Sequence, residues 1–209
     1  MEVNTPEIRG STGGKVLALF DFDGTITRKD TLFDFARYAR GNLFFFKTML
    51  RLAPMLAAHK AGLISATAAK EYFLTAFFGG MPFAEFEQLA TKYSLERIPR
   101  LIRPTARERI YYHLQQQHTV VIVSASAENW IKPWANLEGI RVIATILSVK
   151  NGFINGKLAS KNCNGEEKAT RIKQAFKLSE YDYIYAYGDT KGDKAMLALA
   201  NESFFQYFS

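Results

Sequence analysis

Four aspartates follow two apolar segments of the chain, at the points where those segments end. Asp21 and Asp23 stand two residues apart after the first segment, and Asp189 and Asp193 follow the other. In an extended strand a spacing of two places both side chains on one side, and Asp193 comes one helical turn after Asp189. Carboxylates that share a site repel one another, and a hard cation with oxygen ligands relieves the repulsion. The pattern predicts a Mg²⁺ site, although a polar turn and a capped helix would explain each pair by itself.

Two further side chains could bind an anion. Ser124 ends another apolar run, and its hydroxyl could act with the amides of Ala125 and Ser126 if these residues open a helix. Lys168 stands near the start of an expected helix, where a cation opposes the helix dipole. Taken singly, Ser124 is explained as a helix N-cap and Lys168 as a surface lysine. Together with the carboxylates, they supply the groups that phosphoryl transfer needs.

The runs 15–20, 119–123 and 183–187 are short and continuously apolar, which is typical of strands buried on both faces. Each run is followed by a segment compatible with a helix. Apolar strands that alternate with helices predict an α/β fold with an open parallel sheet. Because ligands bind at the carboxyl ends of the strands in such sheets, we expect the aspartates and Ser124 to meet at one edge.

Residues 31–104 form a long insertion between the first two expected strands and have little strand character. The segment 43–63 is apolar enough to suggest a membrane span, but charged residues and a proline interrupt it, so a soluble pair of helices is favoured. Asp30 and Thr31 can cap a helix at the start of the insertion. Two Asn-Gly pairs within 149–157 predict a hairpin. The other helices expected from the sequence are 66–77, 83–93 and 105–117.

The composition is that of a globular chain with a sizeable core, since 48% of the residues are hydrophobic and 22% are charged. A single cysteine, Cys163, excludes an internal disulfide and favours a reducing compartment, so we expect a cytoplasmic protein. Residues 1–14 are expected to be a flexible lead-in. The formal net charge of +7 favours anionic partners. A basic run at 97–109 is interpreted as a solvated face, because no nucleic-acid-binding motif accompanies it.

Four ordered motifs resemble those of the haloacid dehalogenase superfamily. They are Asp21-Phe-Asp-Gly-Thr-Ile-Thr27, Val121-Ile-Val-Ser124, Lys168 and Gly188-Asp-Thr-Lys-Gly-Asp193, and they span nearly the whole chain. The helical insertion resembles the cap of the phosphoserine-phosphatase-like branch, subfamily IB. The resemblance implies a Rossmann-like α/β core with an inserted all-helical cap of the C1 type. The core would consist of residues 15–30 and 105–209, and the cap of residues 31–104.

The resemblance also implies a role for each aspartate. Asp21 would be the nucleophile that forms an aspartyl-phosphate, and Asp23 would protonate the leaving group and then activate water. Mg²⁺ would be held by Asp21, the main-chain carbonyl of Asp23 and Asp189, with Asp193 as a further ligand or as support. An acid at position 23 implies a phosphatase rather than a dehalogenase or a cation-pumping ATPase.

By the same resemblance, Ser124, the amide of Ala125 and Lys168 would bind the phosphoryl group. Phosphoserine phosphatases usually carry Ser and Glu where this chain has Gly24 and Asp30. A carboxylate at Asp30 could still hold a substrate ammonium from the cap side, but it reaches less far. The apolar and basic cap segment is similar to that of a second group in the branch, bacterial enzymes related to the phosphatidylglycerophosphate phosphatases.

These observations predict a Mg²⁺-dependent phosphate-monoester phosphatase that acts through an aspartyl-phosphate on a small phosphorylated substrate. The enzyme would be phosphoserine-phosphatase-like, with a leaving group that is bulkier than serine and partly apolar. A phospholipid-type, phosphatidylglycerophosphate-like phosphatase is the alternative within the family. A non-catalytic basic module that binds anionic membrane or nucleic acid is the alternative outside it, and such binding would weaken steeply with salt. Nucleic acid is not expected as a partner, whereas peripheral contact with an anionic membrane stays open.

Overall fold

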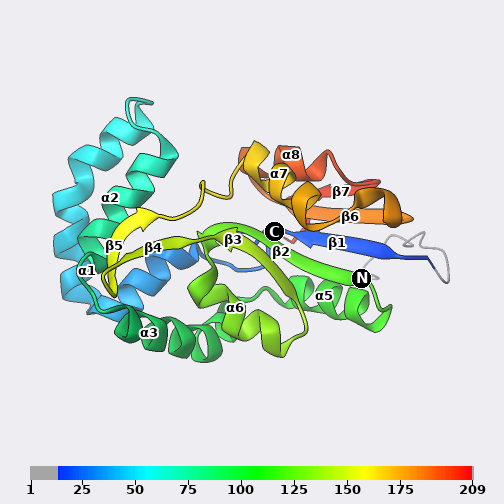
Figure 1. Cartoon of the computed structure of the whole chain (residues 1–209), viewed down its shortest axis with the longest axis horizontal. Helices are drawn as coiled ribbons and strands as arrows, with labels where there is room; N and C mark the ends of the chain where they lie inside the picture. The colour runs from blue at the N-terminus through cyan, green and yellow to red at the C-terminus, as the bar shows by residue number, and fades with distance from the viewer. Residues whose placement is uncertain (1–13, 209) are drawn as a thin grey trace, which may run out of the picture.

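A five-stranded parallel sheet forms the centre of the molecule, and a two-stranded antiparallel hairpin lies apart from it (Figure 1). The structure, a computed structural model, describes residues 14–208, so the lead-in expected at residues 1–14 lies outside this range except for Gly14. The strand order in the sheet is β3-β2-β1-β6-β7. The expected parallel α/β fold is therefore confirmed. The sheet consists of β1 (Val16–Phe20), β2 (Thr119–Ala127), β3 (Arg141–Thr145), β6 (Tyr183–Gly188) and β7 (Glu202–Phe205), and the hairpin of β4 (Leu147–Lys150) and β5 (Phe153–Leu158).

Helices cover both faces of the sheet. In Figure 1, α5 and α6 lie on one side of the strands, and α7 and α8 lie on the other. The helices are α1 (Thr31–Lys60), α2 (Ala66–Phe78), α3 (Phe83–Glu96), α4 (Ile98–Leu101), α5 (Pro104–Gln115), α6 (Glu128–Leu137), α7 (Glu166–Ala175) and α8 (Lys194–Leu197). Two short 3₁₀ helices, η1 (Leu178–Glu180) and η2 (Lys191–Asp193), complete the described elements.

Alternate residues of β1 belong to two different apolar cores. Ala18 and Phe20 pack in the core that includes side chains of α5 and α6. Leu17 and Leu19 pack in the core that includes side chains of α7 and α8. Because both faces of the strand are covered, every residue of β1 is buried, and this double burial explains the continuous apolar run in the sequence.

The central strands lie where the sequence predicts them, and the outer strands were not predicted. β1, β2 and β6 coincide with the three apolar runs, although β2 continues to Ala127. β3 and β7 lie at the two edges of the sheet and are only partly buried. An edge strand needs no continuous apolar run, so the local sequence signal for these two strands is weak.

The insertion consists of helices at one end of the sheet, close to the hairpin (Figure 1). The helices expected at 66–77, 83–93 and 105–117 are confirmed as α2, α3 and α5. The prediction of two helices within 43–63 is wrong, because α1 continues through this segment to Lys60. The break in α1 comes earlier, at Gly41 (φ 76°). Among the described residues, no helix combines the length and the apolar character that crossing a membrane requires.

The predicted hairpin is present, but only one of its two Asn-Gly pairs makes the turn. Residues 151–152 connect β4 to β5, whereas residues 155–156 lie inside β5. The main-chain amide of Gly80 donates to the carbonyl oxygen of Ile154 at 2.8 Å. The hairpin is therefore bonded to the segment that connects α2 to α3, and it extends the helical end of the molecule.

The basic run at 97–109 is only partly the solvated face that the sequence suggested, because Arg100 is exposed whereas Arg97 and Arg109 have partners within the fold. The Arg97 guanidinium donates to both carboxylate oxygens of Asp34, at 3.0 and 3.1 Å. Arg109 is buried, and its guanidinium donates to the hydroxyl of Tyr207. Arg97 and Arg109 therefore join separate parts of the fold.

Candidate active site

The carboxyl ends of β1, β2 and β6 bring the predicted site residues to one edge of the sheet. Asp21 follows β1 and Asp189 follows β6. The Asp21 amide donates to the Tyr187 carbonyl oxygen at 2.9 Å, which extends the pairing of these strands to the first aspartate. Ser124 lies on the neighbouring strand β2. Polar side chains at the carboxyl ends of three adjacent parallel strands therefore lie at a single edge of the sheet, as expected for this fold class.

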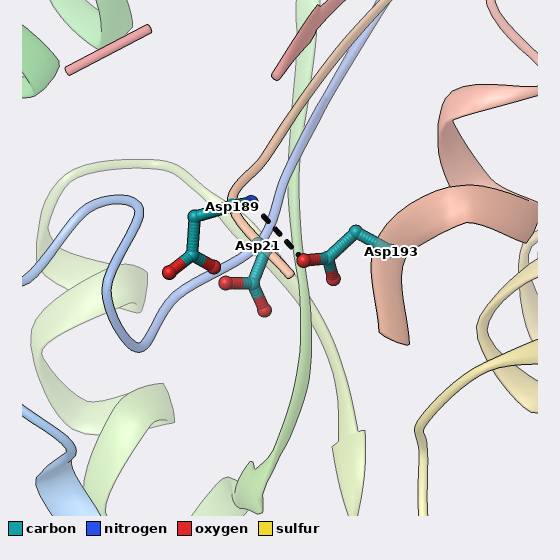
Figure 2. A group of neighbouring side chains, drawn as sticks. All are labelled: Asp21, Asp189 and Asp193. Atoms are coloured by element: carbon teal, nitrogen blue, oxygen red, sulfur yellow. Dashed lines mark hydrogen bonds between the residues drawn. The ribbon is translucent and has the colours of Figure 1, made fainter. Parts of the chain in front are cut away.

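The carboxylates of Asp21, Asp189 and Asp193 face one another (Figure 2). One oxygen from each of them lies within 4.8 Å of the oxygens of the other two. The Thr25 hydroxyl lies 3.0 Å from an oxygen of Asp21 and 3.2 Å from an oxygen of Asp189, so it links the two strand ends. Among the described residues, Asp23 does not contribute its carboxylate to this cluster.

Lys168 is buried against the acidic cluster, with 1% of its surface exposed. Its Nζ donates to Asp21 Oδ1 at 2.6 Å and to Asp193 Oδ1 at 2.7 Å. Burial alone would lower the pKa of Lys168, but the two carboxylates outweigh it and hold the pKa above its ordinary value. The interpretation of Lys168 as a surface lysine is therefore wrong. An ammonium in the first turn of α7 opposes the helix dipole, and these two carboxylates compensate for that position.

The carboxylates of the cluster differ in how well their charges are stabilised. Burial raises the pKa of Asp21 to about 7, although the charge of Lys168 opposes the shift. The pKa of Asp189 is raised too, first by burial and then by repulsion from Asp193. Burial would raise the pKa of Asp193 as well, but Lys168 and the loop amides outweigh it and the pKa is lowered. Asp21 and Asp189 thus lack sufficient positive charge around them.

The donor set of the cluster fits a hard divalent cation. Once all three carboxylates are ionised, they and the Lys168 ammonium carry a net charge of −2 in a small volume, and oxygen ligands of this kind suit Mg²⁺. A cavity of about 300 Å³ is lined by Thr25 and Asp189, so the Asp189 side of the cluster borders an open space. Burial raises the pKa values of Asp21 and Asp189, so a cation bound between them would favour their ionised forms.

Both carboxylate oxygens of Asp193 are already used within the protein. Oδ2 accepts hydrogen bonds from the main-chain amides of Asp189 and Thr190 and from the Thr190 hydroxyl, at 3.1, 2.9 and 3.0 Å. Oδ1 accepts from Lys168. Asp193 therefore fixes the loop that carries Asp189 and orients Lys168, which fits a supporting position better than that of a direct metal ligand.

Two glycines allow the acidic residues to come so close. A Cβ at Gly24 would lie 2.2 Å from Oδ2 of Asp189, and the backbone of Gly24 has a φ of 85°. A Cβ at Gly188 would lie 2.5 Å from the Cβ of Asp193. Any larger residue at either position would push an aspartate away from the cluster.

Asp23 belongs to a different hydrogen-bond network, between the insertion and strand β2. Its Oδ1 accepts from both the amide and the hydroxyl of Thr31 at 2.6 Å, and its Oδ2 accepts from the Ser126 hydroxyl at 2.6 Å. The indole nitrogen of Trp130 donates to the Thr31 hydroxyl at 3.1 Å. The first residue of α1 therefore fixes the direction of the Asp23 carboxylate, a role of Thr31 that sequence reasoning missed.

The local structure around Ser124 differs from the helix start that the sequence predicts there. β2 continues through Ala125 and Ser126, and α6 begins only at Glu128, so these amides do not open a helix. The Ser126 amide donates to the Ser124 hydroxyl oxygen at 3.0 Å. Ser124 is fully buried beside Asp23. The Ser124 hydroxyl therefore stays at the same edge of the sheet as the aspartates, but it does so from a strand and without a helix dipole.

Lys70 reaches the same edge from the insertion, which sequence reasoning also missed. Its Nζ donates to the Ala125 carbonyl oxygen at 2.8 Å and to Asn162 Oδ1 at 2.7 Å. Burial lowers the pKa of Lys70 to about 8, although the charges of Asp23 and Asp30 oppose the shift. A sequence signal does exist, because Lys70 shares a helical face with apolar residues of α2 that are buried, namely Phe73, Leu74 and Phe77.

Asp30 caps α1, as its position in the sequence predicts. Its Oδ1 accepts from the amides of Leu32 and Phe33 at 2.9 and 3.3 Å. Burial and the negative charge of Asp23 raise the pKa of Asp30 to about 6. Oδ1 is thus engaged by the helix, and Oδ2 is the oxygen that a substrate group could reach.

Comparison with known proteins points to one family. The model of the haloacid dehalogenase-like hydrolases matches residues 18–198. Protein CicA of Caulobacter vibrioides is 33% identical over 199 residues, which cover 92% of this chain and 86% of CicA. A probable phosphatase of Mycobacterium tuberculosis is 27% identical over 205 residues, which cover 92% of this chain and 69% of that protein.

A likeness of fold extends to a solved structure of phosphoserine phosphatase, a phospho-aspartyl intermediate analogue. The TM-score is 0.66 at 19% sequence identity, and the match covers 91% of this chain and 85% of that chain. The sequence match at 18–198 includes the whole acidic cluster and Lys168.

Proposed function

The chain belongs to the haloacid dehalogenase-like hydrolases, and we propose that it is a Mg²⁺-dependent phosphate-monoester phosphatase that forms an aspartyl-phosphate on Asp21. The observation that carries this proposal is the buried contact of Lys168 with Asp21 and Asp193, next to the carboxylate of Asp189. Phosphoryl transfer depends mainly on positioned charges. A fixed cation beside a carboxylate cluster provides them at the end of the central strand.

Mg²⁺ would be held by Asp21, Asp189 and the main-chain carbonyl of Asp23, with Asp193 as support. When bound, the cation would neutralise charge on the phosphoryl oxygens and on the cluster. The assignment of Asp193 to support follows from its hydrogen bonds, which occupy both of its carboxylate oxygens.

In the proposed first step, an Asp21 oxygen attacks the phosphorus atom and the bond from phosphorus to the leaving oxygen breaks. Asp23 gives its proton to that leaving oxygen. In the second step, a water molecule attacks the phosphorus of the aspartyl-phosphate and the bond from phosphorus to the Asp21 oxygen breaks. Asp23 takes the water proton, inorganic phosphate leaves and the Asp21 carboxylate is restored. Thr31 and Ser126 support this role, because their hydrogen bonds hold the Asp23 carboxyl group in one direction.

Lys168, Ser124 and the amide of Ala125 would bind the other phosphoryl oxygens. An ammonium has three N–H donors, and Asp21 and Asp193 accept from Lys168 in the structure. One donor thus remains for the phosphoryl group. In the structure the Ser124 hydroxyl accepts from the Ser126 amide and donates to Asp23 Oδ2 at 3.5 Å. On substrate binding, the hydroxyl hydrogen would turn from Asp23 to the phosphoryl group.

We propose that residues 31–104 form the cap and that residues 15–30 and 105–209 form the catalytic core. Lys70 supports this division, since it joins a helix of the cap to the Ala125 carbonyl beside the phosphate-binding residues. Substrates would then place their leaving group between the catalytic edge and the cap. Asp30 remains the cap-side acid that could contact that leaving group.

The substrate would be a small phosphate monoester whose leaving group is larger and less polar than serine. Only one oxygen of Asp30 is free of the helix cap, so an amino group would be held weakly there. Phosphoserine is therefore expected to be a poor substrate.

The decisive experiment is a screen of phosphate monoesters with the full chain, in Mg²⁺ and after chelation, together with the Asp21→Asn variant. We expect phosphate release in Mg²⁺ that chelation abolishes. Asp21→Asn should reduce kcat by at least about 10³-fold because the nucleophile is lost. Acid quenching during turnover of a ³²P-labelled substrate should leave label on the wild-type protein, and hydroxylamine should remove it. More than about a tenth of wild-type turnover in folded Asp21→Asn would contradict the covalent mechanism.

A further inference from the structure

The second half of α1 carries large apolar side chains that point away from the molecule. Leu43, Phe46 and Leu50 are 70%, 59% and 77% exposed, and their spacing of three and four residues places them on one helical face. Leu63, just beyond the helix, is 81% exposed. In Figure 1 this part of α1, drawn in cyan, forms the outer edge of the helical end. We name the face formed by Leu43, Phe46 and Leu50 the outer face of α1.

This outer face is not needed for the packing of the helix. The opposite face of α1 supplies Leu52, which is buried, and Phe45 and Met49, which pack against the core. The ring of Phe45 lies 5.5 Å from that of Phe77 on α2. α1 is therefore apolar on two sides, and only one of them contacts the rest of the protein.

Positive charge surrounds the outer face. Between Asp34 and Glu71 the sequence contains no acidic residue. Within residues 14–208, no carboxylate lies within salt-bridge distance of the exposed cations of α1. These exposed cations are Arg37, Arg40, Lys47, Arg51 and Lys60.

Two of these arginines lie over exposed rings. The guanidinium of Arg40 is 4.6 Å from the centre of the Phe44 ring, and that of Arg37 is 5.7 Å from the centre of the Phe46 ring. Cationic and apolar groups therefore alternate on one surface instead of forming separate patches. Such a surface matches a lipid bilayer with anionic headgroups, where the apolar groups enter the acyl boundary and the cations meet the headgroups.

We propose that the outer face of α1 docks the protein on the surface of an anionic lipid bilayer. The helix would lie along the interface, with Leu43, Phe46 and Leu50 inserted and Lys47 and Arg51 at the level of the headgroups. The proposal is independent of the catalytic mechanism, because none of these residues touches the acidic cluster or Lys168.

Vesicle co-sedimentation of the full chain tests the proposal. Vesicles of phosphatidylglycerol and phosphatidylcholine should retain the protein at about 50 mM NaCl and release most of it at about 500 mM, where screening is short-ranged. Vesicles of phosphatidylcholine alone should retain little. Leu50→Glu should lower the partition coefficient at least about tenfold, because it places a carboxylate at the apolar boundary. The double variant Lys47→Glu/Arg51→Glu should do the same through charge.

Matched controls separate this surface from general effects. Leu137→Glu changes a leucine that is 78% exposed at the end of α6, and Lys173→Glu reverses an exposed cation on α7. Both variants should sediment like wild type. All variants should keep wild-type melting temperatures and wild-type turnover of a soluble aryl phosphate. If the α1 variants lose vesicle binding but keep wild-type turnover, the docking proposal is tested separately from the proposed catalytic mechanism.

Several results would overturn the docking proposal. They are absence of retention on anionic vesicles at low salt, equal retention on neutral vesicles, and wild-type retention of Leu50→Glu. A wild-type dimer that Leu50→Glu converts to a monomer, without vesicle binding, would assign the outer face to a second copy of the chain. Phe46→Ser repeats the test with a milder change if Leu50→Glu fails to fold.

Discussion

The ammonium of Lys168 lies 2.6 Å from Oδ1 of Asp21, although the two residues are 147 positions apart in the chain. Both side chains are buried, and Asp193 accepts a second hydrogen bond from the same ammonium. This contact joins the residue that follows the central strand β1 to the first turn of α7. It makes Lys168 both an electrostatic partner of the proposed nucleophile and a structural link across the catalytic edge.

Replacing Lys168 by Met should destabilise the protein in the absence of metal. Two buried carboxylates would lose their cation, and an uncompensated buried charge costs about 3–5 kcal/mol. Chemical denaturation of the metal-free variant measures this loss. Adding Mg²⁺ should restore part of the stability, because the cation also binds the carboxylates. Equal stability of metal-free wild type and variant would contradict the importance of the contact.

Asp189→Asn should weaken the response to Mg²⁺ while leaving the metal-free fold intact. Asparagine removes a charged ligand but keeps an oxygen that accepts from Thr25. Because the pKa of Asp189 is raised by burial and by Asp193, its charge is unfavourable without metal. The metal-free variant should therefore melt no lower than metal-free wild type. A titration of activity with Mg²⁺ should shift to higher concentration, and an unchanged titration would exclude Asp189 as a ligand.

Thr31→Val should impair the proton transfer assigned to Asp23. The substitution removes the hydroxyl that donates to Asp23 but preserves the shape of the side chain and the main-chain donor. We expect kcat to fall more for alkyl phosphates than for activated aryl phosphates, because aryl leaving groups need little protonation. Asp23→Asn should show the same pattern more strongly. Thr31→Ser, which keeps the hydroxyl, should restore the wild-type ratio of alkyl to aryl turnover; equal losses on both substrates would contradict this role.

His113 should make the stability depend on pH below neutrality. Burial, with smaller effects of His118 and Arg109, lowers the pKa of His113 to about 3, whereas an unfolded histidine titrates near 6.5. Between these values the unfolded chain binds more protons than the folded one. The stability due to this group is therefore complete above about pH 6.5 and falls by up to about 1.4 kcal/mol per pH unit as the pH decreases.

Denaturation between pH 7 and pH 5 measures this effect. In His113→Gln the decline should be shallower than in wild type, whatever the stability of the variant at pH 7. His59→Gln, which changes a less buried histidine at the end of α1, is the matched control and should decline like wild type. The same decline in His113→Gln as in wild type would show that His113 does not cause it.

The sequence by itself determined the central strands and the position of the aspartates. β1 and β6 appear as apolar runs because both of their faces are buried, and the aspartates follow because the catalytic edge begins where that burial ends. These are local patterns, because a buried strand or helix requires a regular spacing of apolar residues along the sequence. Edge strands such as β3 and β7 are half-exposed, so their period is too weak to identify them.

Only the tertiary structure decided which side chains meet at that edge. The contacts of Lys168 with Asp21, of Ser126 with Asp23 and of Lys70 with Ala125 span 147, 103 and 55 positions in the chain. No local period encodes such pairs, because they depend on how separate elements pack. The orientation of the side chains of α1 also depends on how separate elements pack. Its sequence is apolar on two sides, and only its packing against α2 decides that Phe45 faces inward while Leu50 faces solvent.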